Sequence, residues 1–255
     1  MAFTGIFDSG LGGLTILKAL QEQFPNEEFV YLADNKNLPY GNKSCSQIQD
    51  FALKNARFLT SLGECKGLII ACNTASISAH SLLTKLHKIP IIEMVDPTIK
   101  ELFEETGMPT KVGILATSFT TSSEAYKQKI QKRSPGTKVH QIASPHLVPL
   151  IEAGDEKQLQ SCLVQYFSMF RDNIEVVILG CTHYSLIKSL IQQLYPRITL
   201  IDSPKAVIKE FNHNIAISSN SFPRTTFFCT EHNTLWQTLS DNILGISCSW
   251  NVTKI

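Results

Sequence analysis

The chain has 255 residues, of which 43% are hydrophobic and 18% charged, and its formal net charge is +1. This composition is typical of a globular protein with one large domain or two smaller ones. It excludes a strongly basic nucleic-acid-binding surface, and the sequence has no apolar run of about 18 residues that could cross a membrane. The first residues lack a basic leader, and Asp8 interrupts their apolar run, so they do not predict a signal peptide.

Apolar runs alternate with helical periodicities along the whole chain. The predicted strands cover residues 4–7, 28–33, 68–71, 89–93, 111–117, 138–143, 177–180, 198–201 and 225–229. A helical pattern follows each strand, and these helices end near residues 24, 62, 86, 106, 133, 170, 195, 212 and 244. Residues 144–154 read as a loop or a short helix. This alternation predicts an α/β fold with mainly parallel sheets, flanking helices and right-handed crossovers.

Two stretches of the sequence are near-copies of each other, Leu68–Ser76 and Val177–Ser185. Each is an apolar run that ends in a small residue, followed by a cysteine and then by hydroxyl or amide side chains. Their cysteines, Cys72 and Cys181, are 109 positions apart. Both should lie where a strand ends and a helix begins, which is the edge at which open α/β sheets bind ligands.

The same offset aligns other strand ends. Residues 5–9 fall on residues 114–118, and residues 89–93 fall on residues 198–202. Several coincidences at one spacing indicate an internal duplication. We therefore expect two pseudo-symmetric domains that face each other across a cleft containing the active site. The predicted division is residues 1–95 plus 206–255 for the first domain and residues 96–205 for the second.

Two thiols that face each other across a cleft suggest a specific chemistry. A cysteine near a helix N-terminus is expected to have its pKa lowered from ~8.5 toward neutrality. Inversion of a stereocentre by proton transfer needs a base on one face of the carbon and an acid on the other, with the roles exchanged in the reverse reaction. Cys72 and Cys181, one as thiolate and one as thiol, would meet that need.

Other interpretations of the cysteines remain open at this point. Their odd number and the lack of CxxC spacing favour reduced thiols in a cytoplasmic protein over a disulfide framework or a zinc ribbon. Zinc on Cys72, Cys181 and His183 would match no common spacing. The remaining cysteines are expected to be small buried hydrophobes: Cys45, Cys65, Cys162, Cys229 and Cys248.

Two further classes of function can be compared with these features. The glycine-rich run at residues 8–13 could be a phosphate cradle or a tight turn, but it does not fit GxGxxG and no Walker lysine follows it. That misfit counts against a nucleotide-binding oxidoreductase. A two-lobed protein that closes on a small anion would share the symmetry, but it would gain nothing from two thiols in its cleft.

Four motifs, taken in this order and spacing, resemble those of bacterial glutamate racemases over essentially the whole chain. They are Asp8-Ser9-Gly10-Leu11-Gly12-Gly13, Ala33-Asp34 with Pro39-Tyr40-Gly41, Ala71-Cys72-Asn73-Thr74-Ala75-Ser76, and Gly180-Cys181-Thr182-His183-Tyr184. The related aspartate racemases share the two cysteines, but an acidic residue usually stands where this chain has His183. That difference favours glutamate over aspartate. The chain departs from the family pattern at Ala116, Ser144 and Ser185.

The resemblance implies a cofactor-independent enzyme without a metal, which interconverts L- and D-glutamate and supplies D-glutamate for peptidoglycan. It also implies a protein that is often a homodimer. The residue matching Cys72 would take the α-proton from D-glutamate and the one matching Cys181 would take it from L-glutamate. Asp8 would assist Cys72, and His183 with Glu152 would assist Cys181. The implied substrate-binding residues are Asp8, Ser9, Pro39, Tyr40, Gly41, Asn73, Thr74, Thr117, Thr182 and His183.

Three of these residues also have a simpler structural interpretation. Asp8 could cap a helix, His183 could be a hydrogen-bonded structural histidine, and Glu152 could be a solvated loop acid. The substrate-binding roles nevertheless make physical sense, because a dianion can be held by hydroxyls and helix N-termini without a buried cation.

Overall fold

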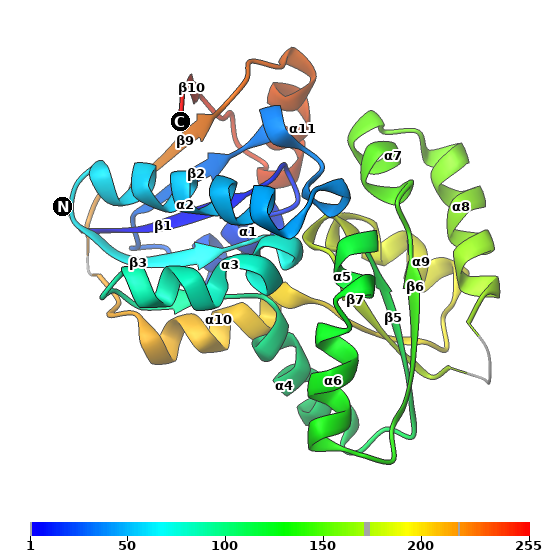
Figure 1. The fold of residues 1–255 in the computed structure, drawn as a ribbon. Helices are drawn as coiled ribbons and strands as arrows, with labels where there is room; N and C mark the ends of the chain where they lie inside the picture. The colour runs from blue at the N-terminus through cyan, green and yellow to red at the C-terminus, as the bar shows by residue number, and fades with distance from the viewer. Residues whose placement is uncertain (1, 171–173, 219) are drawn as a thin grey trace.

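The computed structural model describes residues 2–170, 174–218 and 220–255, and two parallel sheets lie side by side in it (Figure 1). The first sheet has the order β10-β9-β2-β1-β3-β4 and the second the order β6-β5-β7-β8. The first contains β1 (Phe3–Asp8), β2 (Phe29–Ala33), β3 (Cys65–Ile70), β4 (Ile91–Ile92), β9 (Thr225–Cys229) and β10 (Trp250–Val252). The second contains β5 (Lys111–Ala116), β6 (Lys138–Ala143), β7 (Val176–Gly180) and β8 (Thr199–Ile201). The α/β class is therefore confirmed.

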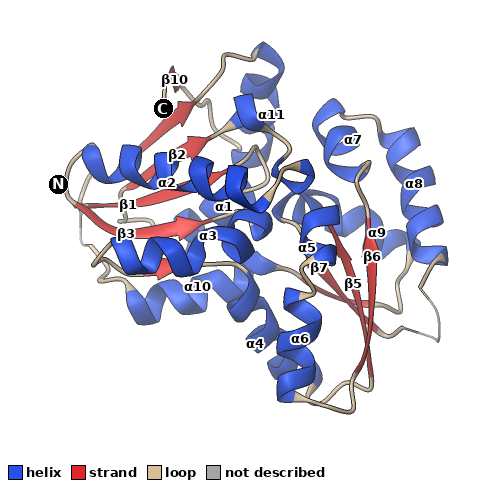
Figure 2. Ribbon diagram, viewed as in Figure 1, coloured by secondary structure: helices blue, strands red, loops and turns tan. Residues whose placement is uncertain are grey.

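Helices cover both faces of each sheet (Figure 2). In the first sheet, α1, α10 and α11 pack on one face and α2 and α3 on the other. In the second, α4 and α6 pack on one face and α7, α8 and α9 on the other. The helices are α1 (Leu14–Gln23), α2 (Cys45–Ser61), α3 (Asn73–Leu86), α4 (Val95–Thr106), α5 (Ser118–Ser122), α6 (Ala125–Arg133), α7 (Leu147–Ala153), α8 (Glu156–Ser168), α9 (Lys188–Leu194), α10 (Ser203–Asn214) and α11 (Thr234–Leu244), with 3₁₀ turns η1 (Asn35–Asn37), η2 (Tyr40–Asn42) and η3 (Thr182–Ile187).

Each sheet with the helices that cover it is called a half below, and the two halves repeat one strand order. The order β2-β1-β3-β4 in the first half matches β6-β5-β7-β8 in the second. The pairing of β3 with β4 matches that of β7 with β8 at the spacing of 109 residues, since Leu68 pairs with Ile91 and Val177 pairs with Leu200, whereas the pairing of β1 with β3 and that of β5 with β7 differ by one position. All of these pairs are parallel. The carboxyl ends of equivalent strands therefore present equivalent positions.

The last part of the chain returns to the first half. β9 pairs with β2, β10 pairs with β9, and Val207 and Phe211 of α10 enter the core beneath α1. Helix α4, which begins where the chain first crosses between the halves, packs against both α10 and the second sheet. We keep the division into residues 1–95 plus 206–255 and residues 96–205 as a proposal.

Some local features differ from the sequence expectations. The sequence predicts a helix that begins after Pro97, whereas α4 begins at Val95 and contains Pro97 in its first turn. A proline costs little there because its missing N–H would have no partner inside the helix. The segment after Cys181 is a 3₁₀ turn before it becomes α9. The helix expected around residues 124–133 is found as α6, but the short helix α5 before it was not expected, and the two meet at Glu124, which has a φ of 53°. The three-residue strand β10 was not expected.

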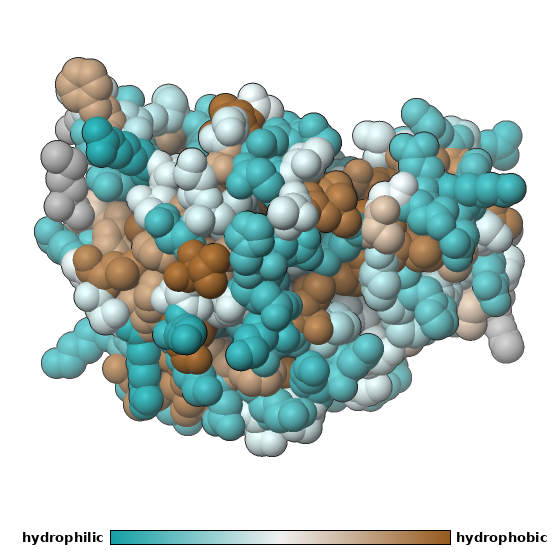
Figure 3. Space-filling view, turned by 90° about the horizontal axis from the view of Figure 1, so that it is seen from above, coloured by the Kyte–Doolittle hydropathy of each residue, from teal (hydrophilic) through white to brown (hydrophobic). Residues whose placement is uncertain are grey.

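The surface mixes hydrophilic and hydrophobic side chains, and several hydrophobic ones lie along the junction of the two halves in the view from above (Figure 3). Within the described ranges, no helix combines the length and the apolar character that a membrane crossing requires.

Candidate active site

A small cavity lies where the carboxyl ends of the two sheets meet. β1 ends at Asp8, β3 leads into Cys72, β5 leads into Thr117 and β7 leads into Cys181. The cavity has a volume of about 20 Å³, which is room for roughly one water molecule. It must widen before an amino acid can enter. Its lining residues are Asp8, Ser9, Pro39, Tyr40, Gly41, Cys72, Asn73, Thr74, Thr117, Val148, Cys181, Thr182 and His183.

The structure brings nearly all of the residues singled out from the sequence to this one cavity. Every one of them lines it except Glu152, which lies behind His183. Val148 also lines the cavity and was missed, because a valine in an apolar helical run carries no signal of chemistry. Sequences separated by more than 100 positions meet here because the duplicated strands end at the same place.

Cys72 is buried at the start of α3, and its sulfur lies 3.8 Å from the hydroxyl oxygen of Ser9. Burial raises the pKa of the Cys72 thiol, and the negative charge of Asp8 raises it further, while the backbone N–H of Ala75 acts in the opposite sense. The expectation that a helix N-terminus would lower this pKa is therefore wrong for Cys72. Desolvation outweighs the partial charge of the helix end.

Asp8 both stabilises a turn and lines the cavity. Its Oδ2 accepts hydrogen bonds from the backbone N–H groups of Gly13 at 2.8 Å and Gly10 at 3.3 Å, so it holds the glycine-rich turn in place. Its buried Oδ1 has no hydrogen-bond partner among the described residues. Burial raises the pKa of Asp8, although the charge of His183 and the bonds from the turn lower it. One carboxylate oxygen of Asp8 thus stabilises the turn, and the other is available to accept a hydrogen bond.

The second cysteine is linked to a histidine and a carboxylate. The sulfur of Cys181 lies 3.9 Å from Nδ1 of His183, and Nε2 of the same ring lies 2.7 Å from Oε1 of Glu152. Burial alone would lower the pKa of His183, but its hydrogen bonds with Cys181 and Glu152 and the charge of Glu152 raise it well above its ordinary value. These contacts favour the protonated form of the ring, which is held between a sulfur and a carboxylate.

The two cysteines consequently have different surroundings. Cys72 lies near the carboxylate of Asp8, and Cys181 lies beside the imidazole of His183. The pseudo-symmetric backbone therefore carries an asymmetric distribution of charge. One cysteine has a carboxylate near it, and the other has a histidine that is bonded to a carboxylate.

The halves approach each other closely around the cavity through glycines. A Cβ atom on Gly10 would lie 2.8 Å from Oε1 of Glu152, and one on Gly41 would lie 2.7 Å from Cβ of Thr117. The hydroxyl oxygens of Thr74 and Thr117 are 3.1 Å apart across the same junction. Gly10 is not at positive φ. The glycine-rich turn, which the sequence left open as a phosphate cradle or a tight turn, serves here to admit side chains of the other half.

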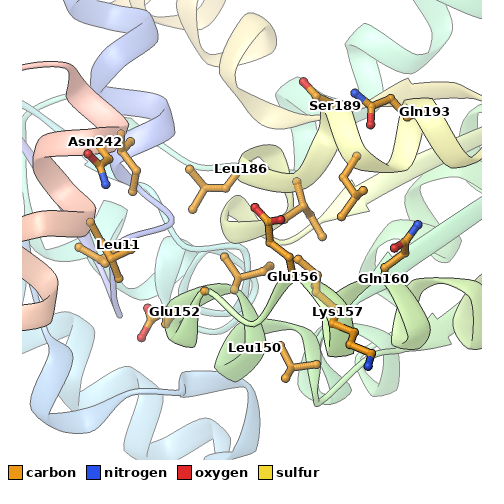
Figure 4. Close-up of a pocket in the computed structure, with 17 residues that line it drawn as sticks. Leu11, Leu150, Glu152, Glu156, Lys157, Gln160, Leu186, Ser189, Gln193 and Asn242 are labelled. Atoms are coloured by element: carbon orange, nitrogen blue, oxygen red, sulfur yellow. The ribbon is translucent and has the colours of Figure 1, made fainter.

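A second and larger cavity of about 980 Å³ lies next to Glu152. It is open to solvent and is lined by α7, α8 and the η3–α9 segment of the second half and by Leu11 and α11 of the first (Figure 4). Glu152 lies at one end of this cavity and also holds His183. It is therefore not a solvated loop acid, because its carboxylate joins the active-site histidine to the larger cavity.

The other cysteines lie away from the cavity. Cys229 and Cys248 are buried as expected, Cys65 and Cys162 are only half-buried, and Cys45 is exposed, so the interpretation as a buried hydrophobe is wrong for Cys45. All seven cysteines belong to the described part of the chain and carry free thiols. Within that part, no group of three or more His, Cys, Asp or Glu side chains is placed to hold a metal ion.

The fold and this cavity can be compared with known proteins. The family model of the Asp/Glu/Hydantoin racemases matches residues 13–211. The chain belongs to this family of racemases.

Three individual proteins that are similar to this chain are all glutamate racemases. The glutamate racemase of Persephonella marina is 36% identical over 247 residues, which are 94% of this chain and 93% of that protein. The crystal structure of glutamate racemase isoform RacE1 from Bacillus anthracis has a TM-score of 0.91 at 28% identity and covers 100% of this chain and 98% of that one. The glutamate racemase of Francisella tularensis, solved in complex with D-glutamate, has a TM-score of 0.90 at 32% identity, with 99% and 97% covered.

Proposed function

We propose that the protein is a glutamate racemase that inverts Cα of the amino acid by transferring protons between two cysteines, without a cofactor. One observation carries the proposal. A single cavity receives Cys72 and Cys181 from equivalent strand ends of two matched halves. A carbon held between them would be reached from opposite faces. The similarity to glutamate racemases, one of them solved with D-glutamate, supports the choice of substrate.

The proton transfers balance without any external reagent. A thiolate on one face removes the α-proton and becomes a thiol, while the thiol on the opposite face donates its proton to Cα and becomes a thiolate. Cys181 would accept the proton of L-glutamate and Cys72 that of D-glutamate. The positive His183 beside Cys181 and the carboxylate of Asp8 near Cys72 would assist these exchanges. After one turnover the two sulfurs have exchanged protonation states, and the reverse reaction restores them.

The rest of the lining would hold the two carboxylates of the substrate and stabilise the charge that develops at the α-carboxylate. Hydroxyl and amide groups supply neutral donors around the cavity, and these come from Ser9, Asn73, Thr74, Thr117 and Thr182. Donors fixed before the reaction are effective because they need no rearrangement when charge develops. Pro39, Tyr40 and Gly41 would form the wall from η2.

The cellular role follows from the proposed reaction. A glutamate racemase would supply D-glutamate for peptidoglycan in the cytoplasm, and we propose that role and location together. We also propose that the protein forms a homodimer.

The proposal includes the roles of Asp8 in assisting Cys72 and of His183 with Glu152 in assisting Cys181.

The experiment is a racemisation assay followed by circular dichroism, with the L and D forms of glutamate, aspartate, glutamine and asparagine as substrates. We expect rapid interconversion of glutamate alone and entry of solvent deuterium at Cα in D₂O. Preferential turnover of aspartate would instead favour an aspartate racemase. Binding of glutamate without turnover, retained after both cysteines are replaced, would favour a two-lobed anion-binding protein.

A further inference from the structure

A buried tyrosine of the second half is bonded to a cavity residue of the first. Tyr126 lies on α6, and its hydroxyl donates a hydrogen bond to Oδ1 of Asn73 at 2.6 Å. Asn73 is the first residue of α3 and directly follows Cys72. Both side chains are buried, with Tyr126 0% and Asn73 2% exposed. The bond therefore joins the halves beside the proposed base for D-glutamate.

The other end of the Asn73 amide is a donor without an acceptor. Nδ2 of Asn73 is buried and has no hydrogen-bond partner among the described residues, although Asn73 lines the cavity. An asparagine amide carries its oxygen and its two N–H donors on opposite sides. Because the oxygen is bonded to Tyr126, the N–H donors point away from that hydroxyl. A buried donor left unpaired costs stability, and an anionic group in the cavity would satisfy it.

We propose that Tyr126 is a positioning residue that fixes the Asn73 amide so that its N–H donors face a carboxylate of the substrate. The inference rests on the proposed racemase function. Tyr126 does not line the cavity, so it acts only through Asn73. The bond joins residues of both halves and is already formed in this structure, so the donor is oriented before a substrate binds.

Two features of Tyr126 suit it to this role. Burial raises the pKa of its hydroxyl, and the charge of Glu93 raises it further, so the group stays protonated and remains a donor over the pH range in which the protein is folded. The ring is also packed in the core beneath the second sheet with Ile114 and Ile130. Because the packed Tyr126 ring cannot move with the Asn73 amide, its hydroxyl favours the amide orientation that places Oδ1 toward it over the flipped orientation.

The test is a double-mutant cycle with Tyr126→Phe and Asn73→Ala, assayed by racemisation of L- and D-glutamate. Loss of one buried hydrogen bond predicts that Tyr126→Phe lowers kcat/KM by about tenfold, mainly through a higher KM. If Tyr126 acts through Asn73, the double variant is no worse than Asn73→Ala. A wild-type chain that fails to racemise glutamate would contradict the proposed function, whereas the cycle tests the positioning role within an active enzyme.

The control is Tyr184→Phe in the same half. Tyr184 is also fully buried, and its hydroxyl lies 2.7 Å from Oγ of Ser144, which does not line the cavity. This variant should lose similar thermal stability while its KM changes by less than about twofold. The proposal is overturned if Tyr126→Phe has the KM of the wild type, if the two single effects multiply in the double variant, or if Tyr184→Phe raises KM as much as Tyr126→Phe.

Discussion

A Cβ atom on Gly12 would overlap Nδ1 of His183. The turn after β1 and the segment after β7 are thus in contact at a residue that has no side chain. His183 is held on its other side by Glu152 at 2.7 Å. The position of the imidazole beside Cys181 therefore depends on a glycine of the opposite half.

Substitution of Gly12 by alanine should displace His183. The added methyl group meets the ring and backbone of His183 rather than a flexible chain end, so we expect a loss of about 1–3 kcal/mol in the free energy of unfolding and at least tenfold in kcat/KM. Urea denaturation and the racemisation assay measure the two effects. Gly136→Ala is the control, because a Cβ there meets nothing within 4 Å. Equal activity in the two variants would contradict the prediction.

Isotope exchange can distinguish the roles of the two active-site cysteines. Cys72→Ala and Cys181→Ala should each lower racemisation by at least about 100-fold, since general acid–base groups contribute that much or more. In D₂O, Cys181→Ala should still exchange the α-proton of D-glutamate, and Cys72→Ala that of L-glutamate, because one base remains in each. Proton NMR follows the exchange. Exposed Cys45 provides the control, and racemisation near the wild-type rate in either active-site variant would rule out the two-base scheme.

Glu152→Gln should alter the pH dependence of activity. The carboxylate helps to raise the pKa of His183, so its neutral replacement should lower that pKa and let the ring lose its proton at a lower pH. We expect the alkaline side of the kcat/KM profile to move toward lower pH. Glu156→Gln is the matched control, since Glu156 lines the same large cavity without a bond to His183. Superimposable profiles for wild type and Glu152→Gln would contradict the assigned link.

Glu93 should make stability depend on pH. It is buried where the chain first crosses between the halves, accepts hydrogen bonds from the backbone of Val95 and Asp96, and has its pKa raised by burial from 4.5 to about 7. The folded state therefore binds the proton more tightly than the unfolded state. This contribution is complete below pH 4.5 and is lost as pH rises to about 7, by roughly 3 kcal/mol in all.

Urea denaturation between pH 4 and pH 8 measures this effect. Glu93→Gln should flatten the fall in stability, because its side chain does not titrate, while the exposed acid variant Asp50→Asn should keep the wild-type slope. If the stability of Glu93→Gln fell with rising pH as steeply as that of the wild type, another group would be responsible for the pH dependence.

The strands and the meeting of the two cysteines could be predicted from the sequence because both depend on local patterns. Buried strands are continuous apolar runs, and the repeat at 109 positions placed Cys72 and Cys181 at equivalent strand ends. The observed strand orders agree with that repeat. The short strand β10 was not predicted because three residues, two of them exposed, have too little pattern to distinguish them from a loop.

Properties that depend on three-dimensional packing could not be predicted. The pKa of Cys72 is set by how completely the halves exclude water, which no local spacing reveals. The contact of Gly12 with His183 and the bond from Tyr126 to Asn73 join distant segments whose approach depends on the closure of both halves. The large cavity beside Glu152 arises in the same way, from helices of different halves.

The return of the chain to its first sheet has a consequence for biosynthesis. A ribosome delivers β5 to β8 before it delivers β9, so the middle of the polypeptide can complete its sheet while the outer edge of β2 is still unpaired. That edge offers free backbone groups to any neighbouring extended peptide until the last thirty or so residues emerge. A nascent chain stalled before β9 should therefore aggregate more readily than the finished protein, although its second sheet is already whole.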